Sequence, residues 1–334
     1  MQQSKIPEFP EPSWSNTRQG SYDSCPRQYY YQYYASWQGW PNGSRHSIQE
    51  CRHAYFWSKR ETIPTWKGKL IHGAISKLLL GNLLDKVKNE TSTLLKKEWE
   101  WSTFRGEKFR ELGIDACKEP KHILLMEHSE NEISDEIAQE VEEAVLESIT
   151  RFSTLPVLAE FIEIAARNDR YSFVELPNGA FNPRQIEFAE PFSEQKLAIW
   201  SMIDCAYEVE PGTCLVYDWK TGRIPADAEE ARLTDQLIVY AHDVRAKLLE
   251  KSPDREVQVE AFELYLPEGK AFGGHVSAGD LEDARDRIVT QASKLKQLHN
   301  LIESQGKNAC EATPKEGLCR NCSFRKMCDV AWKI

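Results

Sequence analysis

The sequence lacks any long apolar run. Its longest uninterrupted apolar stretches, such as HILLM at 122–126, fall far short of the roughly 18 residues that a membrane span needs. The first residues, MQQSKIPEFPEPSW, are polar and rich in proline, unlike the basic and then apolar pattern of a signal peptide. Internal repeats and low-complexity tracts are also missing. We therefore expect a cytoplasmic, globular protein.

A regular disulfide framework is missing as well. The 334 residues, of which 41% are hydrophobic and 28% charged, suffice for one large core or two modest ones without covalent staples. The cysteines show no even spacing, so we expect reduced thiols or metal ligands. There are nine of them: Cys25, Cys51, Cys117, Cys205, Cys214, Cys310, Cys319, Cys322 and Cys328.

The chain has fewer basic residues than acidic ones, 42 Lys or Arg against 52 Asp or Glu, which gives a net charge of −10. A net negative charge argues against nucleic-acid binding, but the charge is unevenly distributed. Residues 13–80 hold nine Lys or Arg against three Asp or Glu, whereas residues 127–163 hold eleven acids against one Arg. One surface can therefore be basic while another is acidic, although each run can equally be a solvated helix face.

Helical patterns dominate the first half of the chain. An aromatic-rich helix is predicted over 21–37 and an amphipathic one over 66–87, where apolar residues recur at helical spacing. Residues 131–166 also read as helical, with a break near Pro156. We interpret 85–169 as a helical, acidic insertion.

The second half changes to strand patterns. Alternating and β-branched runs with turn signals between them precede a helix, a strand pair and a last helix. This order predicts a mixed α/β sheet covered by helices. The expected strands are 171–176, 185–192, 196–209, 213–220, 257–266 and 272–276, and the expected helices are 229–249 and 278–302.

Two carboxylates and a lysine occur in neighbouring predicted strands, within SMIDCAYEVEPGTCLVYDWKTGR at 201–223. A tight turn joins the strands, so their register can bring Asp204 and Asp218 to the same end of the sheet. Lys220 stands two residues after Asp218 and shares its face. Carboxylate oxygens suit Mg²⁺ or Mn²⁺, and the ammonium group can orient water or stabilise charge on phosphorus. The pattern indicates a hard-cation site for phosphate chemistry.

This stretch resembles the PD-(D/E)XK nuclease superfamily, and within it the RecB-like exonucleases. These include the RecB and AddB nuclease domains, the CRISPR-associated iron–sulfur nucleases and exonuclease V. Asp204 matches the first acid, and Asp218-Trp219-Lys220 matches the (D/E)-x-K element. Upstream, the segment from Gly68 to His72 resembles the helical G-x-x-x-H. Downstream, the segment from Gln236 to Tyr240 resembles the Q-x-x-x-Y helix. Ser201 and Cys205 depart from the residues usual around the first Asp.

The resemblance implies a fold, a reaction and residue roles. The fold is a restriction-endonuclease-like mixed sheet flanked by helices, and the reaction is hydrolysis of DNA phosphodiesters, expected as an exonuclease acting on single strands or ends. In the family's pattern Lys220 activates water, while Gln236 and Tyr240 shape the site. Glu187 or Glu190 is a candidate extra acid. The implied metal ligands are His72, Asp204, Asp218 and the main-chain carbonyl of Trp219.

The cysteines of GLCRNCSFRKMC at 317–328 resemble the C-terminal cluster of the family's iron–sulfur members. In those members a single N-terminal cysteine, followed by Pro and aromatics as Cys25 is here, supplies the fourth ligand. The implied set is Cys25, Cys319, Cys322 and Cys328, holding a [4Fe–4S] cluster with zinc as the alternative. Cys310 is the alternative ligand, placed after these four. The cluster would join the N-terminal and C-terminal segments.

The expected organisation is a helical segment with one cluster ligand and the His helix (1–84), the insertion (85–169), the nuclease core (170–303) and the cysteine cluster (304–334). Aromatics between Tyr29 and Trp40, with arginines nearby, can stack single-stranded bases or simply pack the core. The insertion is a candidate surface for a helicase or another protein partner. DNA repair or recombination, CRISPR adaptation and phage-related DNA processing are the expected settings.

Two other functions stay open from the sequence alone. One is a catalytically inactive subunit of the same fold that binds DNA ends or a helicase. The other is a zinc-stapled module in which the D-x-K element is incidental. The first differs from the nuclease in losing the acids or the lysine, all of which are present here.

Overall fold

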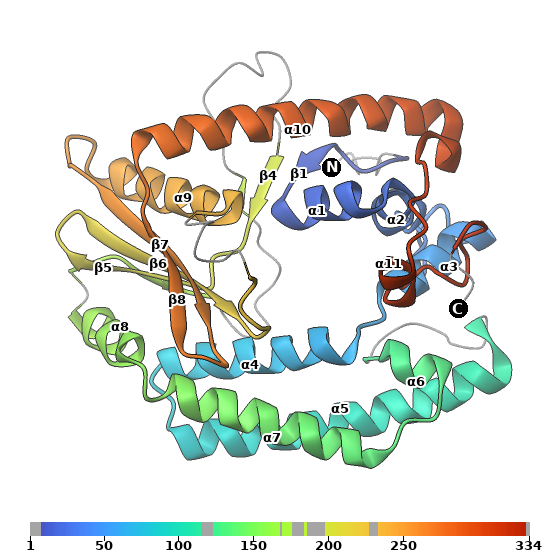
Figure 1. Ribbon diagram of the computed structural model, residues 1–334, viewed down its shortest axis with the longest axis horizontal. Coiled ribbons are helices and arrows are strands. Elements are labelled where there is room, and N and C mark those ends of the chain that lie inside the picture. Colours follow the sequence, from blue (N-terminus) through green and yellow to red (C-terminus); the bar gives the residue numbers. More distant parts are fainter. Residues whose placement is uncertain are drawn as a thin grey trace, which may run out of the picture. The chain divides into compact units, whose positions relative to one another are not determined.

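The computed structural model describes residues 8–114, 123–167, 169–175, 184–185, 198–226 and 233–331 (Figure 1). Contacts divide the chain into two compact units, each assembled from separate stretches of sequence. The segment 85–169, expected as an insertion, is divided between these units. The first unit comprises Met1–Trp66, Lys97–Ser134 and Thr290–Ile334, and the second comprises Lys67–Lys96 and Asp135–Val289.

The second unit is built around a five-stranded mixed sheet. Its order is β2-β5-β6-β7-β8, with β6 and β7 parallel and the other neighbours antiparallel. The prediction of a mixed sheet flanked by helices is confirmed. A separate antiparallel pair is formed by β3 (Arg184–Gln185) and β4 (Ala198–Ser201). The five strands are β2 (Ser172–Val174), β5 (Cys205–Glu210), β6 (Thr213–Lys220), β7 (Gln258–Tyr265) and β8 (Lys270–His275).

Helices cover both faces of this sheet. On one face α9 (Asp235–Lys251) contacts β6 and β7, and on the other α8 (Pro156–Arg167) contacts β2 and β5 (Figure 1). Parallel strands need a crossover, and α9 supplies it between β6 and β7. The core under α9 takes alternate residues of the strands, as expected for a period of two. Its members include Ala206, Cys214, Val216, Val259, Ala261, Leu237, Ala241 and Val244.

The hairpin that joins β5 to β6 depends on Gly212. This residue has φ +96, a left-handed conformation that favours glycine, and a Cβ there would lie 2.5 Å from the main-chain oxygen of Glu256. The side chain of Glu208 accepts a hydrogen bond of 2.7 Å from the Gly212 N–H. The turn therefore fixes the register that brings the ends of β5 and β6 together.

The first unit is mainly helical. Its N-terminal part contains β1 (Ser13–Trp14), α1 (Asn16–Ser24), α2 (Pro26–Tyr30), a π-helical turn (Tyr31–Ala35) and α3 (Gln49–Ser58), and its later parts contain α6 (Met126–Glu130), a 3₁₀ turn (Gly306–Ala309) and α11 (Glu316–Arg320). The helix α7 (Asp135–Phe152) belongs to the second unit. Among the described residues, the ranges of both units include parts of α4 (Ile63–Leu79), α5 (Leu84–Leu112) and α10 (Ala278–Gln305).

Two predicted helices are interrupted. The helix expected over 21–37 breaks at Cys25, which is extended with φ −161, and Pro26 begins α2. The helix expected over 66–87 ends at Leu79, because Gly81 takes φ +81 and stops it before α5 starts. Within the described ranges no helix combines the length and apolar character of a bilayer span.

Candidate metal centre and cysteine pocket

Strand β6 presents Asp218 and Lys220 on the α9 face of the sheet. Cys214 and Val216 pack under α9, and strand alternation puts Asp218 and Lys220 on the same side. Asp218 is only 5% exposed, and its Oδ2 lies 2.5 Å from the Nζ of Lys220. The two side chains predicted to act together are therefore in direct contact.

Asp204 lies just before β5, at a break in the strand expected over 196–209. The antiparallel register pairs Cys205 with Tyr217, so its continuation by one residue sets Asp204 opposite Asp218. Both carboxylate oxygens of Asp204 are used: Oδ2 accepts a 2.7 Å hydrogen bond from the Trp219 N–H, and Oδ1 lies 3.1 Å from His72 Nδ1. Asp204 is thus held by strand β6 and by helix α4 at once.

Helix α4 brings His72 to this carboxylate. One turn earlier, Gly68 lies so close to the segment after β6 that a Cβ would stand 3.3 Å from Thr221 Oγ1. The glycine of the G-x-x-x-H pattern therefore permits the close approach of α4 that the histidine contact requires. Trp219 itself points its ring to the opposite face, where it packs against Tyr217 and Phe152.

The first turns of α9 complete the site. The side chain of Thr234 caps the helix by accepting from the Leu237 N–H. Gln236 Nε2 donates to Asp218 Oδ1 at 3.1 Å and to the Tyr240 hydroxyl at 2.6 Å, while Gln236 Oε1 accepts from Lys220 Nζ at 3.4 Å. Gln236 therefore touches both members of the Asp218–Lys220 pair and connects them to Tyr240.

The site is a concentration of negative charge in a partly buried place. Burial, and next the charge of Asp204, raise the pKa of Asp218 to about 7 and that of Glu175 to about 7. Burial would lower the pKa of His72, but the Asp204 carboxylate outweighs it and raises the value to about 9. A group of acids that holds protons in this way favours a divalent cation, which can displace those protons.

Sequence reasoning missed two acids, Glu175 and Glu263. Glu175 follows β2, and its N–H donates to the main-chain oxygen of Asp204 at 3.0 Å. His72, Glu175 and Asp204 each offer a ligand atom within 4.8 Å of the others. Glu175 falls in the strand predicted over 171–176, but the sequence does not indicate that this strand pairs with β5, which begins after Asp204. The candidates Glu187 and Glu190 lie outside the described residues.

This donor set fits a hard divalent cation. Carboxylate oxygens are the preferred ligands of Mg²⁺ and Mn²⁺, and one imidazole nitrogen is compatible with Mn²⁺. The group with atoms within 4.8 Å combines His72 and Asp204 with Glu175, while Asp218 is engaged by Lys220 and Gln236. The six side chains predicted for the site form two adjacent hydrogen-bonded groups, which the Trp219 N–H links through the main chain of β6. The first group is His72 with Asp204, and the second is Asp218, Lys220, Gln236 and Tyr240.

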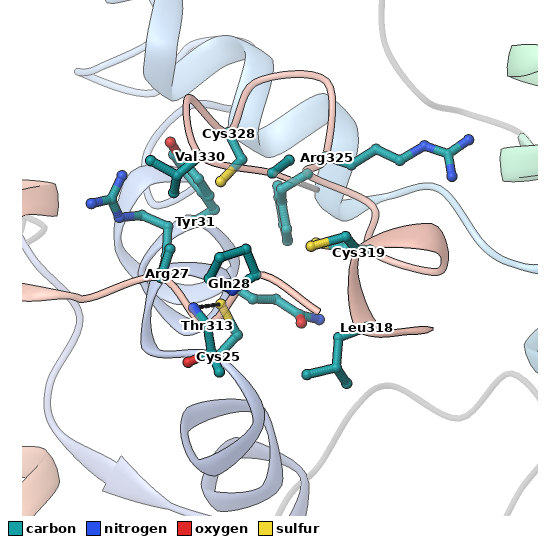
Figure 2. Close-up of a pocket in the computed structure, with 15 residues that line it drawn as sticks. Cys25, Arg27, Gln28, Tyr31, Thr313, Leu318, Cys319, Arg325, Cys328 and Val330 are labelled. Atoms are coloured by element: carbon teal, nitrogen blue, oxygen red, sulfur yellow. Dashed lines mark hydrogen bonds between the residues drawn. The ribbon is translucent and has the colours of Figure 1, made fainter. Parts of the chain in front are cut away.

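A second feature, in the first unit, is a pocket lined by four cysteines. Cys25, Cys319, Cys322 and Cys328 all line it, and Figure 2 shows the labelled thiols around one space. The Thr313 N–H lies 3.5 Å from Cys25 Sγ (Figure 2). Burial raises the pKa of Cys322 to about 11, although a hydrogen bond with the main chain of Phe324 acts in the opposite direction. The four cysteines predicted as cluster ligands, one from the N-terminal segment and three from the C-terminal segment, therefore line one pocket.

The remaining cysteines do not line this pocket. Cys310 is 0% exposed and lies outside the lining, although its main-chain oxygen accepts a 2.8 Å hydrogen bond from Arg27 Nε. Cys51, Cys205 and Cys214 are buried, and Cys117 lies outside the described residues. In the described part of the chain, His72, Glu175 and Asp204 form the one ligand group within 4.8 Å, so no three pocket thiols are that close.

A buried ion network holds the C-terminal cysteine segment. The Arg60 side chain is 0% exposed, lies over the Trp57 ring and donates to Ser323 O at 2.5 Å and to Glu130 Oε1 at 3.1 Å. Arg325 pairs with the other oxygen of Glu130. One carboxylate therefore serves two arginines, one of them from the cysteine segment itself.

The aromatics after Cys25 serve mainly as core. Tyr29, Tyr30, Tyr31 and Tyr34 are between 1% and 6% exposed, and Tyr31 stacks on Phe324 with ring centres 5.6 Å apart. Buried rings cannot stack bases, so packing is the correct interpretation for these four. Tyr33 is less buried and lies under the guanidinium of Arg18 at 4.4 Å.

Comparison with known proteins gave one match at the family level. The model described as the PD-(D/E)XK nuclease superfamily matches residues 13–329, almost the whole chain. No individual curated protein matched the sequence.

Proposed function

Because the chain belongs to the PD-(D/E)XK nuclease superfamily, a family of metal-dependent nucleases, we propose that it hydrolyses DNA phosphodiesters with Mg²⁺ or Mn²⁺ at the Asp218–Lys220 site. The observation that carries this proposal is the contact of Asp218, Lys220 and Gln236 with one another, next to Asp204, which the neighbouring Trp219 N–H holds. We further propose a RecB-like exonuclease that acts on single-stranded DNA or DNA ends.

His72, Asp204 and Asp218, with Glu175 and the main-chain carbonyl of Trp219 as further donors, would hold the cation. A bound Mg²⁺ or Mn²⁺ supplies charge neutralisation at the phosphate and makes water a stronger acid. Lys220 orients the attacking water and stabilises charge on the phosphate. Gln236 and Tyr240 keep the Lys220 and Asp218 side chains in place. The contacts among these side chains support the proposed roles.

The cysteine pocket supports an iron–sulfur cluster held by Cys25, Cys319, Cys322 and Cys328. A single Zn²⁺ with ligands at about 2.3 Å brings its sulfurs to roughly 3.8 Å of one another. No three of the pocket thiols lie within 4.8 Å of one another, which favours a [4Fe–4S] cluster, whose ligands bind different irons. The cluster's role is structural, because it ties the chain's two ends together. A cross-link between Cys25 and the C-terminal cysteines restricts the unfolded chain and so stabilises the fold. This effect grows only slowly with the length of the closed loop.

A direct assay tests the proposed function. The protein is incubated with single-stranded DNA labelled at the 5′ or the 3′ end, in Mn²⁺ or Mg²⁺, with EDTA as the metal-free control. Shortening of the strand that stops in EDTA supports the nuclease, and the label lost first reveals the polarity. DNA binding without cleavage would favour the catalytically inactive end-binding subunit instead.

The setting of this activity is also a proposal. DNA repair or recombination, CRISPR adaptation and phage-related DNA processing all require enzymes that shorten DNA from ends. A helicase or another protein partner would bind the helices of 85–169, where acidic residues concentrate on α7. Deletion of α7 followed by a pull-down from the native host would contradict this role if every complex persisted.

A further inference from the structure

Glu263 lies beside Lys220 on the sheet face that carries the site. The parallel register of β6 and β7 pairs Asp218 with Glu263, and Val259 and Ala261 show that alternate residues of β7 face α9. The Nζ of Lys220 is 2.5 Å from Asp218 Oδ2 and 3.4 Å from Glu263 Oε1. The ammonium group is therefore held between two carboxylates, one on its own strand and one on the next.

Glu263 is itself fixed by donors from this chain. The hydroxyl of Tyr265, two residues on and on the same face, donates to Glu263 Oε2 at 2.9 Å. Thr234 Oγ1, at the start of α9, lies 3.5 Å from Glu263 Oε1. The Glu263 side chain is 14% exposed, so these contacts replace most of its water. Its carboxylate is thus oriented before any substrate arrives.

The two carboxylates that contact Lys220, Asp218 and Glu263, have different proposed roles. Asp218 faces Asp204 and is a proposed cation ligand, so a bound cation competes with Lys220 for its carboxylate oxygens. Lys220 is 28% exposed, and a half-buried ammonium group without an acceptor is costly. Glu263 is not among the proposed cation ligands and is held by Tyr265 and Thr234, so it stays available to Lys220 when the cation is bound.

We propose that Glu263 is a positioning residue that keeps the Lys220 ammonium group aimed at the attacking water once the cation occupies Asp218. This inference rests on the proposed nuclease function and adds to it a residue that contacts neither metal nor DNA. Tyr265 supports Glu263 in turn. Glu263 and Tyr265 of β7, with Thr234 at the start of α9, thus support the Lys220 side chain.

The test compares Glu263→Gln with Glu260→Gln, a matched change on the opposite face of the same strand. We expect Glu263→Gln to lower kcat on end-labelled single-stranded DNA by roughly 10–100-fold, the usual effect of outer-layer partners at a metal site. KM and the Kd for Mn²⁺, measured by calorimetry, should change less than about twofold. Glu260→Gln should match the wild type in all three quantities. Tyr265→Phe should lower kcat by a smaller factor, because it removes one support of Glu263.

Each alternative result is decisive. Unchanged kcat in Glu263→Gln would overturn the inference while the wild-type nuclease stands. Weaker Mn²⁺ binding would overturn it by making Glu263 a metal ligand. If Glu263→Gln does not fold, the decision passes to Tyr265→Phe, and wild-type kcat in that variant counts against the inference. A wild type that binds Mn²⁺ without cleaving DNA overturns the proposed function itself.

Discussion

The main-chain N–H of Trp219 donates a 2.7 Å hydrogen bond to the carboxylate of Asp204. The middle residue of the Asp218-Trp219-Lys220 element therefore holds the first acid of the site with its backbone, while its ring packs into the opposite face of the sheet. His72 engages the other oxygen of Asp204 at 3.1 Å. The position of Asp204 is set by strand β6 and helix α4 together, which explains how separate motifs converge.

The metal-free protein should lose stability as the pH rises. The pKa values of Asp218 and Glu175 are raised to about 7, and that of His72 to about 9. A raised folded-state pKa stabilises the fold at low pH, and this contribution disappears as pH rises through the folded value. We therefore expect the free energy of unfolding in EDTA to fall between about pH 5 and 9.

Denaturant unfolding at several pH values, with EDTA or with Mn²⁺, measures this slope. Mn²⁺ should flatten it and bind more tightly as the pH rises, because binding displaces protons. Asp204→Asn leaves burial in place but removes the charge that adds to the raised pKa of Asp218 and Glu175 and that raises the pKa of His72, so the EDTA curve should become shallower. An equal slope in the wild type and in Asp204→Asn would contradict the electrostatic account of the site.

Loss of one pocket thiol should remove the cluster. Cys319→Ser is expected to abolish the brown colour and the absorbance near 400 nm after anaerobic purification, and to lower the iron and sulfide content. Cys310→Ser is the matched control, since Cys310 is buried outside the pocket, and it should keep the colour. A colourless wild type that contains zinc would contradict the cluster assignment, and loss of colour in Cys310→Ser would restore Cys310 as a ligand.

The network around Glu130 should contribute strongly to stability. Glu130→Gln removes the carboxylate that pairs with the buried guanidinium of Arg60, and breaking a buried ion pair typically costs about 3–5 kcal/mol. Denaturant unfolding should show a loss of this size. Glu316→Gln is the control, because the Glu316–Arg320 pair is 60% exposed on both sides and should change stability by less than about 1 kcal/mol. Equal stability of both variants would contradict a buried role for Glu130.

The sequence predicted the elements better than their ends. The strand 213–220 matches β6 because its apolar residues alternate and Gly212 marks its start. The helix break at Cys25 had a local signal too, since a residue before proline disfavours the helical conformation. The break between β4 and β5 had none: it depends on tertiary hydrogen bonds to Asp204.

The same distinction applies to the site. His72, Asp204, Asp218, Lys220, Gln236 and Tyr240 could be predicted because their types and spacing follow a family pattern. Glu175 and Glu263 could not, because each joins the site through strand pairing, and a single acid at a strand end carries no spacing signal. The composition predicts an insertion over 85–169 that is acidic as a whole, yet α5 carries seven basic and six acidic residues, and the acids concentrate in α7.

The most direct test of the central claim is cleavage of end-labelled single-stranded DNA by the wild type and by Lys220→Ala, in Mn²⁺ and in EDTA. Folding is checked by circular dichroism and cluster retention by the absorbance near 400 nm. We predict cleavage by the wild type in Mn²⁺ alone, and a loss of at least about 100-fold in Lys220→Ala with folding and absorbance intact. Wild-type cleavage rates in Lys220→Ala, or equal cleavage in EDTA, would contradict the account.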